Sequence, residues 1–391
     1  MSSPANQPSP VAMTVIGTGL SGMVQAWALL QTGFPVTLIG PVPDTETKDE
    51  RTTAILMPGI DYLDQLGLWD FIHDSATPLS IMELNDRSVR TIFHATDLGQ
   101  ESFGYNIRNA ALKDALVAKL QANPDLTWHN EFTAAMHQSN TSWTITLTSG
   151  TVIESAFVIG AEGRQSPTRQ EAGIAIDTLS IEQTAIVTVL QGEKPHHNTS
   201  VEWYFQGGPL TLVPMQDDRL ALVWCNDRDV QQERMQRDIA LLEQELTSLT
   251  EERFGVLRIV SPLQSWPVMP LRAERLVAGN CAIIGEAAHI LPPIGAQGFN
   301  ISLHDIMTLT GLLKRIRSAG LVPAHNPILH RYESIRMPEI AMRYRGVNAL
   351  NHLLRSPSSV MHGLRRMALR GISRSTFLKT HLMQAGMVQK K

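Results

Sequence analysis

Three short segments combine glycines with charged residues in a spacing that could hold a phosphate-bearing ligand. The first, Gly17-x-Gly19-x-x-Gly22, follows the apolar run 11–16 and precedes residues 23–31, which have a helical pattern. In such a turn, Gly17 permits a tight bend, Gly19 lets a pyrophosphate approach the backbone, and Gly22 allows close helix–strand packing. The free N–H groups at the helix start favour an anion. The segment therefore predicts a dinucleotide-binding turn.

Two later segments place a carboxylate directly after an apolar strand. Residues 157–160 run into Glu162-Gly163-Arg164, and residues 282–285 run into Glu286. A Pro/Gly-rich loop from 292 to 300 follows Glu286 and enters a helix. We expect Glu286 to accept hydrogen bonds from sugar or ribityl hydroxyls, and the amides of residues 298–300 to point at an electron-rich ring.

One expected residue is missing from the first segment. A dinucleotide fold usually has an acid at the end of its second strand, which holds the adenosine ribose. Here that strand, 36–39, ends in Gly40, and the nearest acids are Asp44 and Glu46 in the following loop. Either of these could reach the ribose instead. The absence disfavours an NAD dehydrogenase, which would also leave residues 270–310 without a role.

The elements that must position these segments can be read from apolar periodicity. Residues 11–39 form a strand–helix–strand unit, because the turn glycines fall between apolar runs. The middle of the chain alternates short strands with turns, at 143–148, 185–190 and 220–224. Residues 231–253 and those from 327 onward have a helical pattern. The sequence predicts a mixed α/β protein with a helical C-terminal region.

Composition narrows the class of protein. The chain has 391 residues, 43% of them hydrophobic, and a formal net charge of −4. These values exclude a disordered chain and disfavour a dedicated nucleic-acid binder. Two cysteines, Cys225 and Cys281, are too few for a disulfide framework and lack metal-ligand spacing, so we expect buried free thiols and no metal. No apolar run is long enough to span a bilayer, and the polar N-terminus does not resemble a signal peptide.

The C-terminal segment has a charge of its own. Residues 355–391 contain eight Lys and Arg and no Asp or Glu, so the remainder of the chain carries −12. One interpretation is a terminal helix with a solvated basic face. The other is a surface that meets anionic lipid or an acidic partner. We expect a cytoplasmic protein, with peripheral contact to the inner membrane face as the open alternative.

Taken in order, the three glycine-containing strand ends resemble those of the group A flavoprotein aromatic monooxygenases. The segments 50–58, 66–69, 207–214 and 285–300 are similar to the ubiquinone-biosynthesis FAD-dependent hydroxylases of the UbiH, UbiF and UbiL type. The resemblance extends from Val15 to Met387. Glu162 and Glu286 stand where the wider family has aspartates, which keeps the charge and adds one methylene.

The resemblance implies a fold with three parts. The first is a discontinuous, Rossmann-like FAD-binding domain of glutathione-reductase type, formed by residues 11–80, 105–177 and 270–325. The second is an inserted β-sheet substrate domain, formed by residues 81–104 and 178–269. A helical region, 326–391, follows.

The resemblance also implies the roles of individual residues. The cofactor would be FAD, with NAD(P)H as a transient co-substrate, and the FAD-binding residues would be Gly17, Gly19, Gly22, Arg51, Arg108, Glu162, Arg164 and Glu286. Residues facing the flavin would be Pro293, Gly295, Gly298, Phe299 and Asn300. The substrate pocket would include Phe205, Pro214, Trp224 and Pro292, although aromatic residues in a sheet are usually core. His289 is expected to be a structural histidine rather than a base, and no residue is assigned as acid or base.

The implied reaction is hydroxylation of a polyprenylphenol in ubiquinone biosynthesis, with NAD(P)H and O2 and through a flavin C4a-hydroperoxide. Two alternatives stay open from the residues. One is a flavin hydroxylase of another aromatic substrate, and the other is a non-catalytic member of a ubiquinone-biosynthesis assembly. The basic segment 355–391 would serve as the contact to such an assembly or to an anionic membrane.

Overall fold

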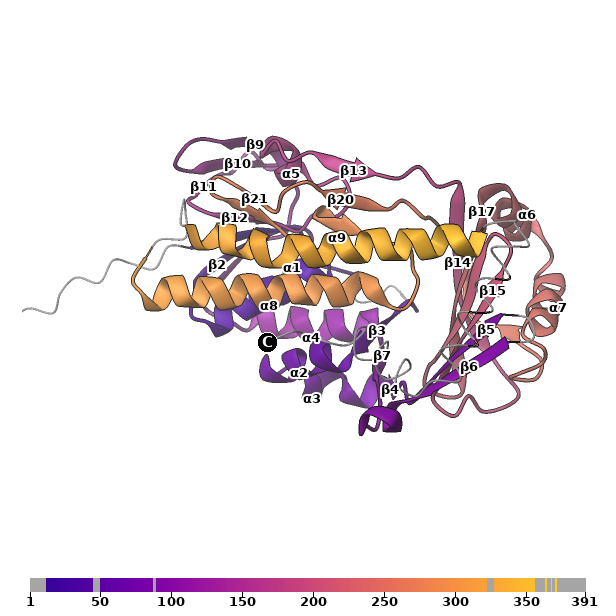
Figure 1. Cartoon of the computed structure of the whole chain (residues 1–391). Coiled ribbons are helices and arrows are strands. Elements are labelled where there is room, and N and C mark those ends of the chain that lie inside the picture. Colours follow the sequence, from indigo (N-terminus) through magenta and orange to yellow (C-terminus); the bar gives the residue numbers. More distant parts are fainter. Residues whose placement is uncertain are drawn as a thin grey trace, which may run out of the picture.

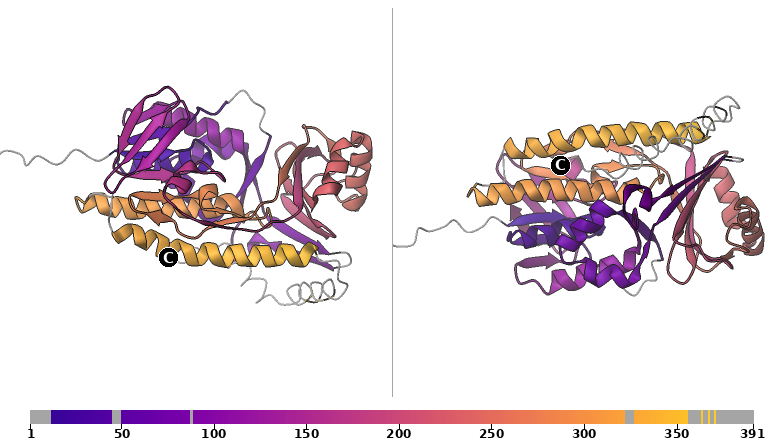
Figure 2. Two further views of the ribbon diagram at one scale, coloured as in Figure 1. Left: turned by 90° about the horizontal axis from the view of Figure 1, so that it is seen from above. Right: turned by 60° about the horizontal axis from the view of Figure 1, so that its bottom comes forward.

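The structure is a computed structural model that describes residues 12–44, 50–86, 89–321 and 327–355, and also residues 363, 367 and 370. The basic segment predicted at 355–391 therefore lies almost entirely outside the described residues. Figures 1 and 2 show two sheet-containing parts, with two long helices running side by side along one of them.

The first part is built on a six-stranded sheet in the order β21-β22-β12-β1-β2-β8. All neighbours are parallel except the edge pair β21 and β22. The central strands are apolar and almost wholly buried, as expected for a parallel sheet covered on both faces. The strands are β1 (Met13–Ile16), β2 (Val36–Ile39), β8 (Leu126–His129), β12 (Val158–Gly160), β21 (Val277–Ala278) and β22 (Cys281–Ile283).

Three small sheets extend this part. One joins β3, β7 and β4 beside the parallel sheet, and a second is a meander of β9, β10 and β11. The third, β13-β20-β23, lies where the chain passes between the two parts. Their bounds are β3 (Thr52–Leu56), β4 (Ala76–Pro78), β7 (Gly104–Arg108), β9 (Thr133–Gln138), β10 (Trp143–Leu147), β11 (Val152–Ser155), β13 (Ile176–Thr178), β20 (Leu271–Ala273) and β23 (His289–Ile290).

Helices cover both parts. The helix α1 packs against α4 and α8, and α8 packs along α9 (Figure 1). The short helices α2 and α3 follow β3. The helices are α1 (Leu20–Gln31), α2 (Met57–Gln65), α3 (Trp69–Ile72), α4 (Asn109–Gln121), α5 (Pro167–Glu171), α6 (Arg228–Gln236), α7 (Ile239–Leu249), α8 (Gln297–Ser318) and α9 (Pro327–Arg355).

The second part is a sheet in the order β18-β14-β17-β16-β15-β5-β6, with β19 also paired to β14. Neighbours are antiparallel except β15 and β5, which are parallel. The strands are β5 (Ile81–Asp86), β6 (Val89–His94), β14 (Gln183–Gln191), β15 (Thr199–Phe205), β16 (Gly208–Pro214), β17 (Arg219–Asp227), β18 (Arg258–Ile259) and β19 (Gln264–Pro267).

This sheet has two different faces. On β15, Val201 and Trp203 pack with Leu246 of α7 in a dense apolar core. Successive side chains of a strand point to opposite faces, so Tyr204 faces the other way. Tyr204 packs with Ile294 of the 292–300 loop and with the end of α9. The sheet thus stands between α6 and α7 on one side and the first part of the molecule on the other (Figure 1).

The mixed α/β architecture and the helical region after residue 327 are confirmed as far as Arg355. The domain boundaries drawn from the sequence stay a prediction. Among the described residues, no helix combines the length and the hydropathy that a bilayer span requires.

Candidate functional site

The turns after four parallel strands meet at one edge of the six-stranded sheet. Ile16 of β1 is in register with both Ile39 of β2 and Gly160 of β12, and Gly160 is in register with Ile283 of β22. Because the strands are parallel, the turns that follow them leave the sheet side by side. These turns begin at Gly17, Gly40, Ala161 and Ile284. The three motifs found in the sequence therefore converge in space.

The first turn is shaped by close backbone contacts. Gly17 has φ 110°, and a Cβ there would lie 2.4 Å from the carbonyl oxygen of Ala161. A Cβ at Gly22 would lie 1.9 Å from the carbonyl oxygen of Gly17. Gly19 differs, since a Cβ there would meet no atom within 4 Å. Gly19 also begins α1 without a side-chain cap, so the first N–H groups of the helix face open space.

The missing acid at residue 40 has a steric explanation. Gly40 has φ 145°, and a Cβ there would lie 2.8 Å from both Cγ2 and Oγ1 of Thr18. Thr18 is fixed in turn, because its hydroxyl donates to the carbonyl of Pro41 at 2.6 Å. A side chain at residue 40 would displace the turn that carries Gly19. Asp44 is exposed in the loop beyond, and Glu46 lies outside the described residues.

The carboxylate of Glu162 is turned toward its own strand end. It accepts hydrogen bonds from the hydroxyl of Ser166 at 2.8 Å, from the backbone N–H of Thr168 at 3.0 Å, and from the Thr168 hydroxyl. Burial raises the pKa of Glu162 above its usual value, against the lowering effect of these donors. Glu162 therefore organises the start of α5, which leaves little of its hydrogen-bonding capacity for a ligand.

Arg169 joins the second motif to the third. This buried side chain donates to the carbonyl of Ala287 at 2.9 Å and to that of Arg164 at 2.7 Å. The guanidinium of Arg164 is half-buried and lies 3.3 Å from the sulfur of Met269. Arg169 thus holds the turns after β12 and β22 at a fixed separation.

Glu286 behaves differently from Glu162. Its side chain is exposed at the sheet edge, and its Oε2 lies 3.8 Å from the position that a Cβ on Gly163 would take. No hydrogen bond to Glu286 occurs among the residues that the structure describes. The two glutamates found in the sequence therefore have different geometry, and only Glu286 presents a carboxylate to an incoming ligand.

The loop expected to face the flavin is exposed at its tip and anchored at its end. Pro293, Gly295 and Gly298 are exposed, and Phe299 is half-buried. Asn300 is buried and bridges to β3: its Oδ1 accepts from the N–H of Leu56 at 2.9 Å, and its Nδ2 donates to the carbonyl of Ala54 at 2.8 Å. The helix α8 starts without a side-chain cap, which leaves its first N–H groups available to a ligand.

A buried ionic cluster supports this loop from behind. Asp305 of α8 lies 2.6 Å from Nε2 of His289, accepts from the N–H of Gly285 at 3.1 Å, and pairs with Arg336 of α9 at 2.9 Å. The charges of His289 and Arg336 hold the pKa of Asp305 below its usual value, although burial opposes them. The motifs did not reveal Arg336. The sequence did contain a signal, because Arg336 falls in a series of residues spaced by four, the spacing of one helix face. The structure buries all of them: Tyr332, Arg336, Ile340 and Tyr344.

Arg51 and Arg108 lie at the same end of the β3–β7 pair. Thr52 is in register with Arg108, and the carbonyl of Arg51 accepts from the N–H of Asn109 at 2.9 Å. The guanidinium carbon of Arg51 is 5.2 Å from the ring centre of Trp266 on β19. The structure thus brings two cations together at the border between the two sheets.

Two of the residues predicted to line the substrate pocket are aromatic and lie in the second sheet. Trp224 and Phe205 pack on the α7 side of the second sheet, away from the converging turns. The guanidinium carbon of Arg234 lies 3.7 Å from the centre of the Trp224 ring. Both aromatic side chains therefore belong to the core of that sheet. Pro214 and Pro292 are buried, and the carbonyl of Pro214 accepts from Asn106 at 2.9 Å.

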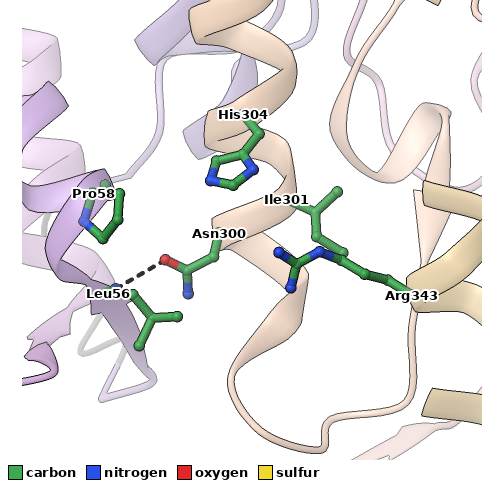
Figure 3. Close-up of a pocket in the computed structure, with 7 residues that line it drawn as sticks. Leu56, Pro58, Asn300, Ile301, His304 and Arg343 are labelled. Carbon is green, nitrogen blue, oxygen red and sulfur yellow. Dashed lines mark hydrogen bonds between the residues drawn. The ribbon is translucent and has the colours of Figure 1, made fainter. Parts of the chain in front are cut away.

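A small pocket lies behind the loop rather than at the sheet edge. Its walls come from β3, α2, α8 and α9, with Asn300 between Leu56 and His304, and Arg343 entering from the side (Figure 3). Its volume is about 10 Å³, which suits about one water molecule. A flavin or a phenol ring would not enter it.

The converging turns fit a dinucleotide with a pyrophosphate. Two uncapped helix N-termini and the open space at Gly19 supply donors for phosphates, and one available carboxylate supplies an acceptor for hydroxyls. The edge of a parallel sheet at the carboxyl ends of its strands is also where such ligands bind.

Comparison with known proteins also supports the binding of a dinucleotide. Residues 10–343 match the family model described as the FAD binding domain. The ubiquinone hydroxylase UbiL of Rhodospirillum rubrum is 30% identical over 379 residues, which cover 95% of this chain and 88% of that protein. The 3-demethoxyubiquinol 3-hydroxylase of Escherichia coli is 27% identical, with coverage of 97% and 98%.

Solved structures share the fold at lower identity. The p-nitrophenol 4-monooxygenase PnpA of Pseudomonas putida superposes with a TM-score of 0.79 at 16% identity, over 96% of this chain and 97% of that one. HpxO of Klebsiella pneumoniae, solved with FAD and uric acid, superposes with a TM-score of 0.77 at 16% identity, over 96% of each chain.

Proposed function

The chain belongs to the FAD-dependent hydroxylases of ubiquinone biosynthesis, and from this membership we propose that it hydroxylates the aromatic ring of a polyprenylphenol. It is a flavin-dependent monooxygenase that uses NAD(P)H and O2. The observation that carries the proposal is the convergence of three glycine-containing strand ends at one sheet edge. The relatives whose names specify ubiquinone hydroxylation match this chain over almost its whole length.

When bound and reduced, FAD supplies the activated oxygen for the reaction. The protein holds the cofactor, positions the phenol and excludes water. We propose that Gly17, Gly19 and Gly22 hold the pyrophosphate, that Arg51 and Arg108 add positive charge, and that Glu286 accepts from the ribityl hydroxyls. Glu162 and Arg169 then fix the spacing of the turns. The N–H groups at the start of α8 would face the flavin ring, with the loop residues Pro293, Gly295, Gly298, Phe299 and Asn300.

The substrate would bind between the 292–300 loop and the face of the second sheet that carries Tyr204. Ile294 of the loop already packs with Tyr204 there, which supports this assignment. In this proposal residues 81–104 and 178–269 form the substrate domain. Residues 11–80, 105–177 and 270–325 form the FAD-binding domain.

The first experiment is the visible absorbance spectrum of the purified protein, before and after added FAD. It would be followed by NAD(P)H oxidation and 18O2 incorporation with phenols of increasing prenyl length. Stoichiometric flavin and a product with one 18O atom, formed faster as the tail lengthens, are expected. Equal rates without a tail would favour a soluble aromatic substrate. Stoichiometric flavin without product from any phenol would overturn the proposal, and absence of flavin would favour the non-catalytic assembly member.

We further propose that the basic C-terminal segment brings the enzyme to its lipid-soluble substrate. This segment is positively charged while the remainder of the chain is negative, which suits an anionic membrane surface. Deletion of residues 356–391 should reduce binding to vesicles that contain anionic lipid and leave the FAD content unchanged. Equal vesicle binding by the full chain and the truncated chain would refute this role and favour a protein partner.

A further inference from the structure

Glu202 is a buried acid for which the reaction described so far has no use. It lies on β15, is only 7% exposed, and comes two residues before Tyr204, on the same face of the strand. Alternation along the strand places it on the same face as Tyr204, toward the 292–300 loop. Glu202 is therefore on the side of the sheet where the substrate is proposed to bind.

The surroundings of Glu202 differ from those of three other buried acids. Among the residues that the structure describes, the buried carboxylates of Glu83, Glu243 and Asp305 each contact an arginine. Glu202 instead accepts hydrogen bonds from two hydroxyl groups, that of Thr211 at 3.2 Å and that of Tyr204. Within the ranges that the structure describes, no arginine or lysine compensates its charge.

Uncharged side chains lie opposite Glu202 on both strands that pair with β15, Thr211 on β16 and Leu84 on β5. The thiol of Cys225, on β17 one strand beyond β16, also lies near the carboxylate. Burial and the nearby Glu202 raise the pKa of Cys225 to about 12, so the thiol is neutral. No charged side chain of β5 or α9 contributes to the pKa of Glu202 in the described part of the chain.

These surroundings suit a proton acceptor. Burial raises the pKa of Glu202 to about 7, while the two hydroxyl donors keep it from rising further. A base with a pKa near the working pH is efficient, because it is partly ionised and still binds a proton well. Burying an acid without a charged partner on a sheet face destabilises the fold, and an apolar residue of similar volume is usually better tolerated there.

We propose that Glu202 is a catalytic base that accepts the proton of the substrate's phenol hydroxyl. The phenol O–H bond breaks as an O–H bond forms on the Glu202 carboxylate, and the resulting phenolate is the electron-rich ring that is hydroxylated. When the hydroxylated ring regains its aromaticity, a ring carbon loses a proton to water and the phenolic oxygen regains one from Glu202. This inference rests on the proposed function, because it needs a phenol as substrate.

The test compares Glu202→Gln with a matched control, Glu243→Gln. Glu243 is a buried acid of the same sheet unit, but it pairs with Arg258 on the α7 side. Both FAD-loaded variants and the wild type are mixed with a short-chain prenylphenol and with an analogue that carries several ring fluorines, enough to ionise the phenol at neutral pH. The measurements are the ultraviolet difference spectrum of the bound phenol, which reports its ionisation, and the rate of hydroxylation in a single turnover.

For wild type, the bound prenylphenol should ionise, and the rate should fall as the pH drops below about 7, because Glu202 becomes protonated. Glu202→Gln should bind the phenol un-ionised, hydroxylate it about 100-fold more slowly, and lose this pH dependence. Its rate on the fluorinated phenol should fall less than about 10-fold, since no proton must be removed. Glu243→Gln should match the wild type in the spectrum and in all rates.

Three results would overturn the inference separately from the proposed function. If wild type hydroxylates the prenylphenol and Glu202→Gln does so with an unchanged ionisation spectrum, Glu202 is not the base. If Glu202→Gln loses activity equally on both phenols, its role is structural. The ultraviolet spectrum tests the inference even if no product forms. A prenylphenol that stays un-ionised when bound to wild type would exclude Glu202 as the proton acceptor.

Discussion

Replacing Gly19 with valine should abolish tight FAD binding while leaving the fold intact. The backbone at Gly19 has φ −69° and ψ 173°, a conformation that any residue adopts, and a Cβ there meets no atom within 4 Å. The cost to the fold is that of a changed helix N-cap, about 1 kcal/mol at most. The new side chain would occupy the space through which the pyrophosphate approaches the helix start.

The expected loss of affinity follows from the contacts that the valine prevents. If two N–H groups at the start of α1 can no longer reach the pyrophosphate, each forfeits about 1.5 kcal/mol. The dissociation constant for FAD should then rise about 100-fold. Quenching of flavin fluorescence during titration of the apoprotein measures this constant, and circular dichroism during heating measures the stability of the fold.

Two further variants separate the cofactor from the fold. Gly17→Ala should lower the melting temperature of the apoprotein, because Gly17 has φ 110° and its Cβ would lie 2.4 Å from the Ala161 carbonyl. Gly311→Ala, in an exposed helical position with no neighbour within 4 Å, should raise it slightly and leave FAD binding unchanged. If Gly19→Val binds FAD within threefold of the wild-type affinity, the phosphates do not lie at this turn and the reasoning fails.

The remaining predictions concern the acids of the site. Glu286→Gln should weaken FAD binding about 10-fold with an unchanged melting temperature, since its carboxylate is exposed and available. Glu162→Gln should instead lower the melting temperature, because three donors lose a charged acceptor. The opposite pattern in flavin titration and thermal denaturation would mean that the two glutamates have exchanged roles. Asp305→Asn should destabilise the protein by about 3 kcal/mol or more in chemical denaturation, because Arg336 would stay buried without its partner. The native pKa of Asp305 is lowered, so its contribution to stability is complete above the unfolded pKa of about 4 and is lost as the pH falls further. Urea denaturation of wild type and Asp305→Asn between pH 7 and pH 3 should therefore show curves that approach each other at low pH, and a constant gap would contradict this account.

The turns of the site could be predicted because their signals are local. Gly17, Gly19 and Gly22 stand between an apolar strand and a helix. Close backbone contacts require glycine at Gly17 and Gly22, whereas Gly19 leaves open space at the start of the helix. Glu162 and Glu286 were found for the same reason. The use that each makes of its carboxylate depends on Ser166 and Thr168 in one case and on open space in the other, which residue type alone does not reveal.

The orientation of the aromatic side chains on β17 illustrates a limit of sequence-based prediction. Both faces of β17 are apolar, with Leu222 and Trp224 toward α7 and Ala221 and Val223 on the other face. The alternation of polar and apolar residues, which usually shows which face of a strand is buried, is therefore absent. An error of one residue in the alignment of the strand then assigns every side chain to the wrong face. Side-chain volume was a better guide, because the large residues of this strand lie on the α7 side.

The ionic cluster behind the loop could not be assembled from the sequence. Asp305 and Arg336 lie on separate helices, 31 residues apart, and His289 comes from a strand between the two sheets. Long-range pairing of this kind depends on how α8 and α9 pack, which no local pattern specifies.

The strand order of the parallel sheet has a consequence for the biosynthesis of the enzyme. The strand β12 pairs with β1 on one side and with β22 on the other, so neighbours in the sheet are separated by more than a hundred residues of chain. The edge is completed from a later segment still, since Glu333 of α9 accepts from the N–H of Leu276 at 2.7 Å and that of Val277 at 3.1 Å. A ribosome-bound chain that stops before β22 lacks one neighbour of β12, and a chain that stops before α9 lacks the contacts of Glu333. FAD should therefore be captured only after most of the polypeptide has been made. Loading of the cofactor is then a late check that the whole chain has folded.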